Sequence, residues 1–173
     1  MALWKKESNF QPDVINSLGY IGLGQIQASS GAFSDVVSHY SNSFPEEYLD
    51  YAKPVSTLTQ AEKSYINEEL KKRDINAKVS GYYFNMMEEK YKLEKLEYQL
   101  MGYNAGPTAT NEIINEFNRR GGGGWKEFKQ FLFSDYSKIK LGYGYGLSAG
   151  EAKAYEVVGY VEGISNYLGY ELT

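Results

Sequence analysis

The chain has 173 residues, a length that suits one compact domain with a real hydrophobic core. Its 18 basic and 22 acidic side chains give a net charge of −4, so it lacks the basic field that neutralises a phosphate backbone, and we expect no nucleic-acid partner. The absence of Cys excludes disulfides and thiol nucleophiles, and the single His39 excludes a His-rich metal cluster, so we expect no metal or other cofactor.

Hydropathy gives no sign of a membrane protein. No apolar run approaches the roughly 20 residues that span a bilayer, and the first ten residues lack the long apolar segment of a secretory signal. We therefore expect no membrane insertion. Either the export information was removed, or another polypeptide or particle carries the chain to its substrate.

The N-terminal part of the chain is expected to begin with a short helix that ends near Lys6. Frequent turn residues from Asn9 to Gly19 follow it, which places Glu7 at a junction between helix and loop. From Gly22 to Ser29 the pattern allows a second short helix.

The segment from Thr57 to Asn104 is rich in helix-favouring Glu, Lys, Leu and Met, and Asp74 and Gly81 are the expected interruptions between its helices. Three more helices are expected, from Pro107 to about Asn118, from Trp125 to Phe133 and from about Ser148 to Leu168.

Turn residues separate these helices. Pro45 and Pro54 punctuate short elements after Gly31, and alternating Gly and Tyr from Leu141 to Leu147 predict a flexible loop that displays aromatic side chains. No long segment alternates polar and apolar residues with period two. We therefore expect a mainly α fold with little or no β structure.

Four separated segments form a motif set. Residues 7–12 are Glu-Ser-Asn-Phe-Gln-Pro, and residues 19–26 are Gly-Tyr-Ile-Gly-Leu-Gly-Gln-Ile. Residues 101–107 are Met-Gly-Tyr-Asn-Ala-Gly-Pro, and residues 151–155 are Glu-Ala-Lys-Ala-Tyr. In this order and spacing the segments resemble the four signature blocks of the lytic transglycosylases, in the superfamily of soluble lytic transglycosylases and goose-type lysozymes.

The resemblance implies a lysozyme-like α-helical domain with a substrate groove, formed by residues 1–173 as a single catalytic domain. It also implies cleavage of the peptidoglycan glycan strand, with Glu7 as the catalytic acid. Outside such a context, a Glu beside Lys5 and Lys6 would be expected to face water. The substrate-binding residues that it implies are Asn16, Gly22, Leu23, Gln25, Tyr103, Asn104, Glu151 and Tyr155.

The chemistry of the second block favours one reaction. Most glycosidases pair their acid with a second carboxylate, but the segment from Val14 to Gln27 contains no Asp or Glu. In the transglycosylases that the chain resembles, the N-acetyl oxygen of the substrate stabilises the sugar cation and the muramyl 6-hydroxyl attacks, which gives a 1,6-anhydro end. Goose-type lysozymes generally carry aspartates where this chain has Asn16 and Ser17.

The chain also departs from the family pattern. Gly24 replaces the usual Met, Ala152 the usual Thr and Glu156 the usual Val. Extra residues between the blocks imply insertions near 33–57 and 119–147, where loop signals concentrate. Glu151 has an equally good structural interpretation, since Ser148 lies three residues before it and the two can form a helix capping box.

Two alternatives to the transglycosylase stay open. One is a goose-type lysozyme-like hydrolase that uses water, and the other is a noncatalytic wall-binding or structural module. We expect the chain to act on peptidoglycan at the bacterial cell wall, in the periplasm or outside the cell. Because only six residues precede Glu7, we expect a domain trimmed from a longer chain, either a bacterial envelope enzyme or, as the missing signal favours, a phage virion component.

Overall fold

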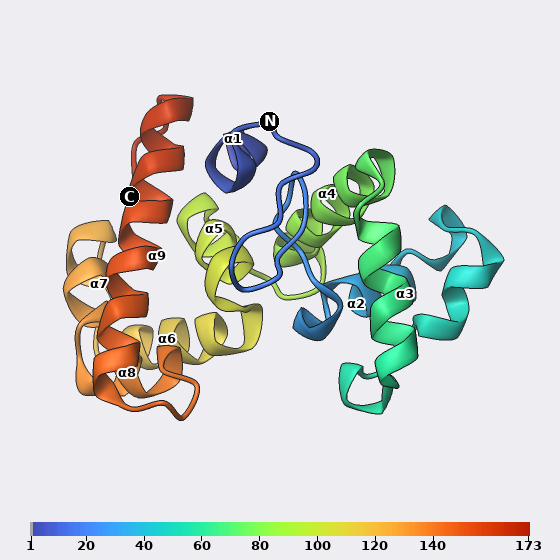
Figure 1. The fold of residues 1–173 in the computed structure, drawn as a ribbon. Coiled ribbons are helices and arrows are strands. Elements are labelled where there is room, and N and C mark those ends of the chain that lie inside the picture. The colour runs from blue at the N-terminus through green and yellow to red at the C-terminus, as the bar shows by residue number, and fades with distance from the viewer. Residues whose placement is uncertain (1) are drawn as a thin grey trace. The chain divides into compact units, whose positions relative to one another are not determined.

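A computed structural model describes residues 2–173 of the chain (Figure 1). Within that range it contains nine α-helices and four short 3₁₀ helices, while β structure is limited to two isolated bridges. The expectation of a mainly α fold is confirmed. The chain divides into two compact units, the first ending at Met86 and the second running from Met87 to Thr173. Of the helices described in this range, none is both long and apolar enough to cross a bilayer.

The first unit is formed by short helices joined by irregular segments. Its α-helices are α1 (Ala2–Ser8), α2 (Ala32–His39), α3 (Gln60–Leu70) and the greater part of α4 (Arg73–Glu89), which contains the boundary between the units. Its 3₁₀ helices are η1 (Ala28–Ser30), η2 (Ser41–Ser43), η3 (Glu46–Tyr51) and η4 (Val55–Thr57).

The expected insertion near residues 33–57 consists of α2 and three of these 3₁₀ helices. Phe33 on α2 is fully buried and meets the ring of Tyr48 edge-on, with ring centroids 5.5 Å apart. The Tyr48 hydroxyl donates a hydrogen bond to Glu69 on α3, and Lys72 lies 2.7 Å from the same carboxylate. Burial raises the pKa of Glu69, but the hydrogen bonds from Lys72 and Tyr48 outweigh it and lower that pKa overall. This network attaches the insertion to α3.

Three expectations for the first unit are wrong. Instead of a helix from Gly22 to Ser29, the chain forms the antiparallel bridges Ile15–Ile21 and Ile21–Ile26 followed by η1, because left-handed backbone angles interrupt the helix. Gly81 does not interrupt a helix but lies inside α4. Asp74 lies in the first turn of α4, so the interruption precedes it.

The second unit is a bundle of five helices after the end of α4. They are α5 (Leu96–Ala105), α6 (Pro107–Arg119), α7 (Trp125–Leu132), α8 (Asp135–Leu141) and α9 (Leu147–Leu168). The long α9 packs against α5 and α8, as the left part of Figure 1 shows. The expected helices from Pro107, from Trp125 and over most of 148–168 are confirmed.

Two details of the second unit differ from expectation. The segment 119–147, expected to be rich in loops, also contains α8. Ser134 caps the N-terminus of this helix, because its side chain accepts a hydrogen bond from the Ser137 N–H. The capping box of Ser148 and Glu151 does not form. Helix α9 begins at Leu147 after Gly146, so Ser148 lies inside the helix and is not its N-cap.

Candidate active site

Glu7 lies in the last turn of α1 and is partly buried. The helix ends directly after it because Asn9 and Phe10 adopt left-handed backbone angles, with φ of 52° and 62°. The expected position of Glu7 at a junction between helix and loop is therefore confirmed.

Ser8 connects the first sequence block to the second. Its side chain is buried, and its Oγ lies 3.1 Å from the Trp4 carbonyl oxygen and 3.2 Å from that of Leu23. Trp4 is held in turn by a 2.9 Å hydrogen bond from its indole N–H to Ser80 on α4. Ser8, the residue next to Glu7, is thus bound to the backbone of the second block. The helix that carries Glu7 and the second block both belong to the first unit.

The loop of the second block is held by a residue far away in the sequence, Asn76 on α4. Its side chain is fully buried, accepts a hydrogen bond from the Gly24 N–H at 2.8 Å and donates to the carbonyls of Ile21 at 2.8 Å and Leu70 at 3.0 Å. Gly22 has a φ of +69°, and a Cβ there would lie 2.7 Å from the Asn76 amide nitrogen. Only glycine fits between this loop and Asn76.

Two more of the expected site residues, Gln25 in the second block and Asn16 before it, bind backbone groups of this region. Gln25 has a φ of 47°, and its amide nitrogen donates to the Gly22 carbonyl at 3.0 Å. The Asn16 side-chain oxygen accepts the N–H groups of Leu18 and Tyr20 at 2.9 and 3.1 Å, which closes the turn before the block. Both polar side chains therefore fix the shape of the loop that follows Glu7.

The third block spans the end of α5 and the first residue of α6 in the second unit, and its Tyr103 and Asn104 lie in α5 and are partly buried. The Asn104 amide nitrogen donates to the Glu156 carboxylate at 3.0 Å, and the ammonium group of Lys153 lies 2.7 Å from the same oxygen. The Asn104 side-chain oxygen is buried and has no hydrogen-bond partner within residues 2–173.

The third block contacts α9 through a residue that directly follows the fourth block and was not among the expected site residues. Glu156, which occupies the position of the family's usual Val, contacts Asn104, whereas Glu151 lies 3.7 Å from Lys138 on α8. Tyr155 is 66% exposed and packs on Phe133 with ring centroids 4.7 Å apart. The replacement of an apolar residue by Glu beside Tyr155 was the available signal.

The structure therefore groups the expected residues by unit. Glu7 shares the first unit with Asn16, which precedes the second block, and with the residues expected from that block, which are Gly22, Leu23 and Gln25. The second unit contains the residues of the last two blocks, which are Tyr103, Asn104, Glu151 and Tyr155.

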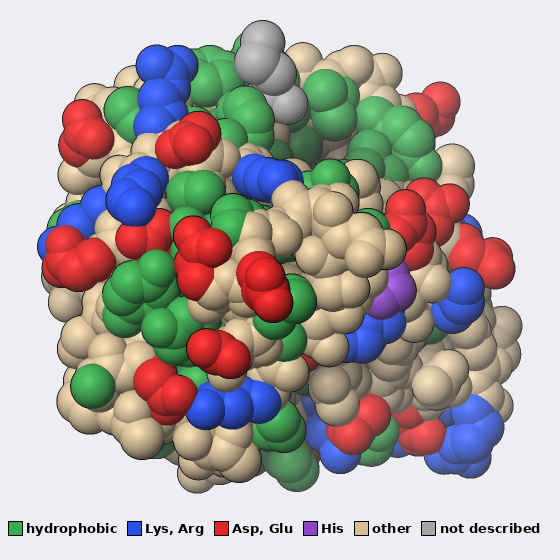
Figure 2. Space-filling model, turned by 90° about the vertical axis from the view of Figure 1, so that its right-hand side faces the viewer, with side chains coloured by type: hydrophobic (Ala, Val, Ile, Leu, Met, Phe, Trp, Pro, Cys, Tyr) green, Lys and Arg blue, Asp and Glu red, His purple; other side chains and the backbone are tan. Residues whose placement is uncertain are grey.

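The surface charge is mixed, and carboxylates do not gather into a cation site. On the face shown in Figure 2, basic side chains are interspersed with acidic ones. Among residues 2–173, no group of three or more His, Asp or Glu side chains is arranged to hold a metal ion.

Comparisons with protein-family models, curated proteins and solved structures find no match to this chain.

Proposed function

We propose that this chain is a peptidoglycan lytic transglycosylase that cleaves the β-1,4 bond between N-acetylmuramic acid and N-acetylglucosamine and leaves 1,6-anhydro ends. The observation that carries the proposal is the set of hydrogen bonds that supports the backbone beside Glu7. A carboxyl group at a helix end is followed by Ser8, which bonds to Leu23, and the Leu23 loop is fixed by Asn76. A rigid support of this kind is what a general acid needs to stay in register with a scissile bond.

Glu7 acts as the sole general acid and base in this proposal. It donates its proton to the leaving glycosidic oxygen while the substrate's N-acetyl oxygen bonds to the anomeric carbon. Glu7 then takes the proton from the muramyl 6-hydroxyl as that oxygen attacks the anomeric carbon and displaces the N-acetyl oxygen. The absence of Asp and Glu from 14–27 supports a mechanism without a second carboxylate.

The third block supplies a binding group suited to this substrate. The buried Asn104 side-chain oxygen can accept the N–H of an N-acetyl group, because its amide nitrogen is already held by Glu156. We assign further substrate contacts in the first unit to the backbone of the Gly22–Gln25 loop. In the second unit we assign them to Tyr103, Glu151 and Tyr155.

The proposed function implies a lysozyme-like fold with a groove for the glycan strand. It places the activity at the bacterial cell wall, in an envelope enzyme or, as we favour, in a phage virion component. Neutral and acetylated sugars are compatible with the acidic net charge of −4.

Digestion of purified peptidoglycan tests the proposal. The wild-type chain should release fragments with anhydromuramic ends, identified by mass spectrometry, and Glu7→Gln should abolish this release while its thermal unfolding stays close to that of the wild type. Asp13→Asn is the matched control, because Asp13 is an exposed carboxylate six residues from Glu7. The control should retain activity.

Two results would contradict the proposal. Free reducing ends in place of anhydro ends, together with inactivity of Asp13→Asn, would show a hydrolase that uses water and a second carboxylate. A folded wild-type chain that binds peptidoglycan without cleaving it would show a noncatalytic wall-binding module.

A further inference from the structure

The connection between α8 and α9 displays aromatic side chains to solvent. In this connection, which we call the Gly-Tyr loop (residues 142–146), the Tyr143 side chain is 57% exposed and that of Tyr145 is 86% exposed. Exposed apolar ring surface is unfavourable in water, so a loop that carries two such rings is a candidate for ligand contact.

The two ends of the Gly-Tyr loop are held together by backbone contacts. A Cβ on Gly142 would lie 2.6 Å from the Gly146 carbonyl oxygen and 3.0 Å from that of Lys138. A Cβ on Gly150 would collide with the same Lys138 carbonyl. Helices α8 and α9 therefore meet backbone to backbone, and the 2.7 Å hydrogen bond from the Tyr145 N–H to the Gly142 carbonyl closes a turn above them. The loop is a projection with a fixed base.

The Gly-Tyr loop is also bound to the third block. The Tyr143 hydroxyl donates a hydrogen bond to the carbonyl of Ala105, the residue directly after Asn104 at the end of α5. All of these residues belong to the second unit. The exposed tyrosines are thus attached to the part of the chain that, in the proposed function, receives an N-acetyl group.

We propose that the Gly-Tyr loop forms an aromatic subsite that binds a sugar ring of the glycan strand beside Asn104, with Tyr145 as the stacking surface. This inference rests on the proposed function and adds a substrate contact outside the four sequence blocks. Tyr143 is a positioning residue, because its hydroxyl ties the loop to Ala105.

The chemistry of the loop favours a neutral glycan. Residues 141–150 contain no Asp, Glu, Lys or Arg, so the loop offers no charge to attract an acidic peptide or a nucleic acid. A tyrosine ring presents a flat apolar face with a polar edge, which matches the apolar face and hydroxyl edge of an N-acetylated sugar. A second copy of the chain is a poorer occupant, since a stable dimer buries about 800 Å² on each partner and this loop has only five residues.

Binding of a β-1,4-linked N-acetylglucosamine hexamer to the folded Glu7→Gln chain tests the subsite by calorimetry. Adding Tyr145→Ala should weaken binding by roughly three- to tenfold, the range expected from losing one aromatic contact. Tyr145→Phe should restore the affinity because the ring, and not the hydroxyl, carries the contact. Tyr143→Phe should also weaken binding, since the loop loses its bond to Ala105.

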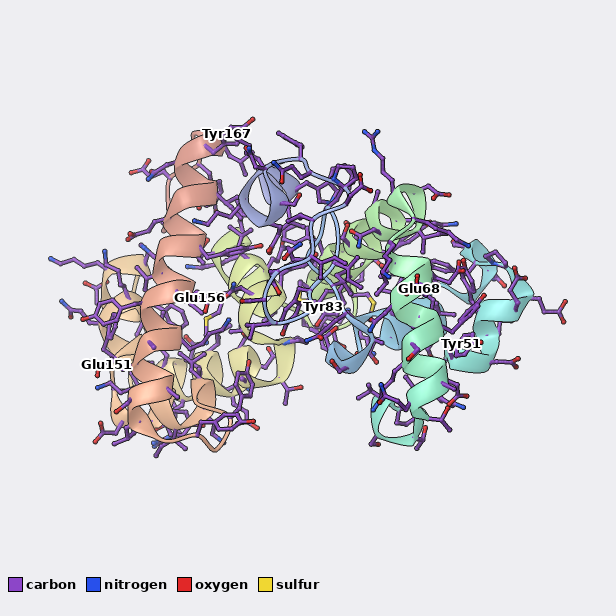
Figure 3. All side chains as sticks on the ribbon, in the orientation of Figure 1. Tyr51, Glu68, Tyr83, Glu151, Glu156 and Tyr167 are labelled. Atoms are coloured by element: carbon purple, nitrogen blue, oxygen red, sulfur yellow. The ribbon has the colours of Figure 1, made fainter. Side chains whose placement is uncertain are left out.

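Tyr167→Ala is the matched control. Tyr167 is also exposed, at 61%, but lies near the far end of α9, about 30 Å along the helix from its first turn (Figure 3). Its replacement should leave hexamer binding unchanged.

The outcomes separate this inference from the proposed function. If Tyr145→Ala binds as well as its parent while Glu7 remains essential for cleavage, the subsite is wrong and the transglycosylase stands. Equal losses from Tyr145→Ala and Tyr167→Ala would also overturn the subsite. If the hexamer does not bind the parent chain and the wild type does not cleave peptidoglycan, both proposals fail. Conversion of a dimer to a monomer by Tyr145→Ala, with sugar binding intact, would assign the loop to contact between copies.

Discussion

Replacing Asn76 with Ala removes three buried hydrogen bonds at once, two from the loop that follows Glu7 and one from the end of α3. The Gly24 N–H and the Leu70 carbonyl lose the side chain that satisfies them, whereas the Ile21 carbonyl keeps its hydrogen bond from the Ile26 N–H at 3.1 Å. Water cannot readily reach these groups, since Asn76 is fully buried. The substitution therefore leaves unsatisfied backbone groups in the interior of the first unit.

The expected loss of stability follows from those bonds. Leaving one buried polar group without a partner costs about 1–3 kcal/mol, so two such groups give at least ~2 kcal/mol. Typical domains are stable by only about 5–15 kcal/mol, so this loss is a large fraction of the total. Asn76→Asp should also destabilise, because it retains an acceptor for Gly24 but places a carboxylate against two carbonyl oxygens.

Native-state hydrogen exchange measures the effect where it arises. In Asn76→Ala the protection of the Gly24 amide should fall by about thirtyfold or more, which corresponds to ~2 kcal/mol. Asn67→Ala is the matched control, because Asn67 is held by one hydrogen bond, from the Ala28 N–H at 2.8 Å, and should cost only about 1 kcal/mol. Equal effects of the two substitutions, or unchanged protection at Gly24, would refute the role assigned to Asn76.

Two titrating groups of the first unit give further predictions. Hydrogen bonds from Lys53 and then from Thr59 lower the pKa of Glu62 to about 2 from its ordinary value of 4.5. Glu62 therefore supports the start of α3 fully above pH 4.5, and this support is lost as the pH falls towards 2. Glu62→Gln should remove the dependence of the start of α3 on acid, as measured by NMR. Burial, followed by Glu69, raises the pKa of the Tyr48 hydroxyl well above 10. Tyr48→Phe should cost about 1 kcal/mol in urea unfolding at pH 7 and remove the decline of stability above pH 10.

Each of these predictions has a control on the same unit (Figure 3). Glu68→Gln alters an exposed carboxylate of α3 that bonds to Lys71, so the acid dependence should remain. Tyr51→Phe removes a hydroxyl from a ring that stacks on Tyr65, and stability should hardly change. Persistence of the acid dependence in Glu62→Gln, or equal unfolding of the two Phe variants, would contradict the assigned contacts.

The helices that the sequence predicted well are those with a strong local signal. Pro107 starts α6 where its missing N–H is harmless, and the apolar stripe of α9 ends at Leu168 before Gly169. The segment after Gly22 was misassigned because its shape depends on a distant side chain, Asn76, which no local propensity can report. Gly81 was misassigned for the opposite reason, since packing of α4 overrides the weak helix preference of one glycine.

The candidate site divides in the same way. The placement of Glu7 at a helix end followed from the turn residues after it, and the structure confirms it. Glu156 carried a signal in the sequence, but its partner Asn104 could not be predicted, because the contact depends on how α9 is rotated against α5. Asn76 carried an overlooked signal, since an amide at a fully buried position of an amphipathic helix requires backbone partners.

The bond between Asn76 and the loop at Gly24 also bears on how this chain can be shortened or redesigned. The bond closes a loop of the 51 residues that lie between the two positions. The entropy cost of closing such a loop changes slowly with its length. The exposed turns of the 33–57 segment can therefore gain residues at little thermodynamic cost, provided that Phe33 and Tyr48 stay packed and α4 still delivers an amide to the same place. A minimal fragment that stopped after the second block would contain Glu7 but would lack the side chain that shapes the loop beside it.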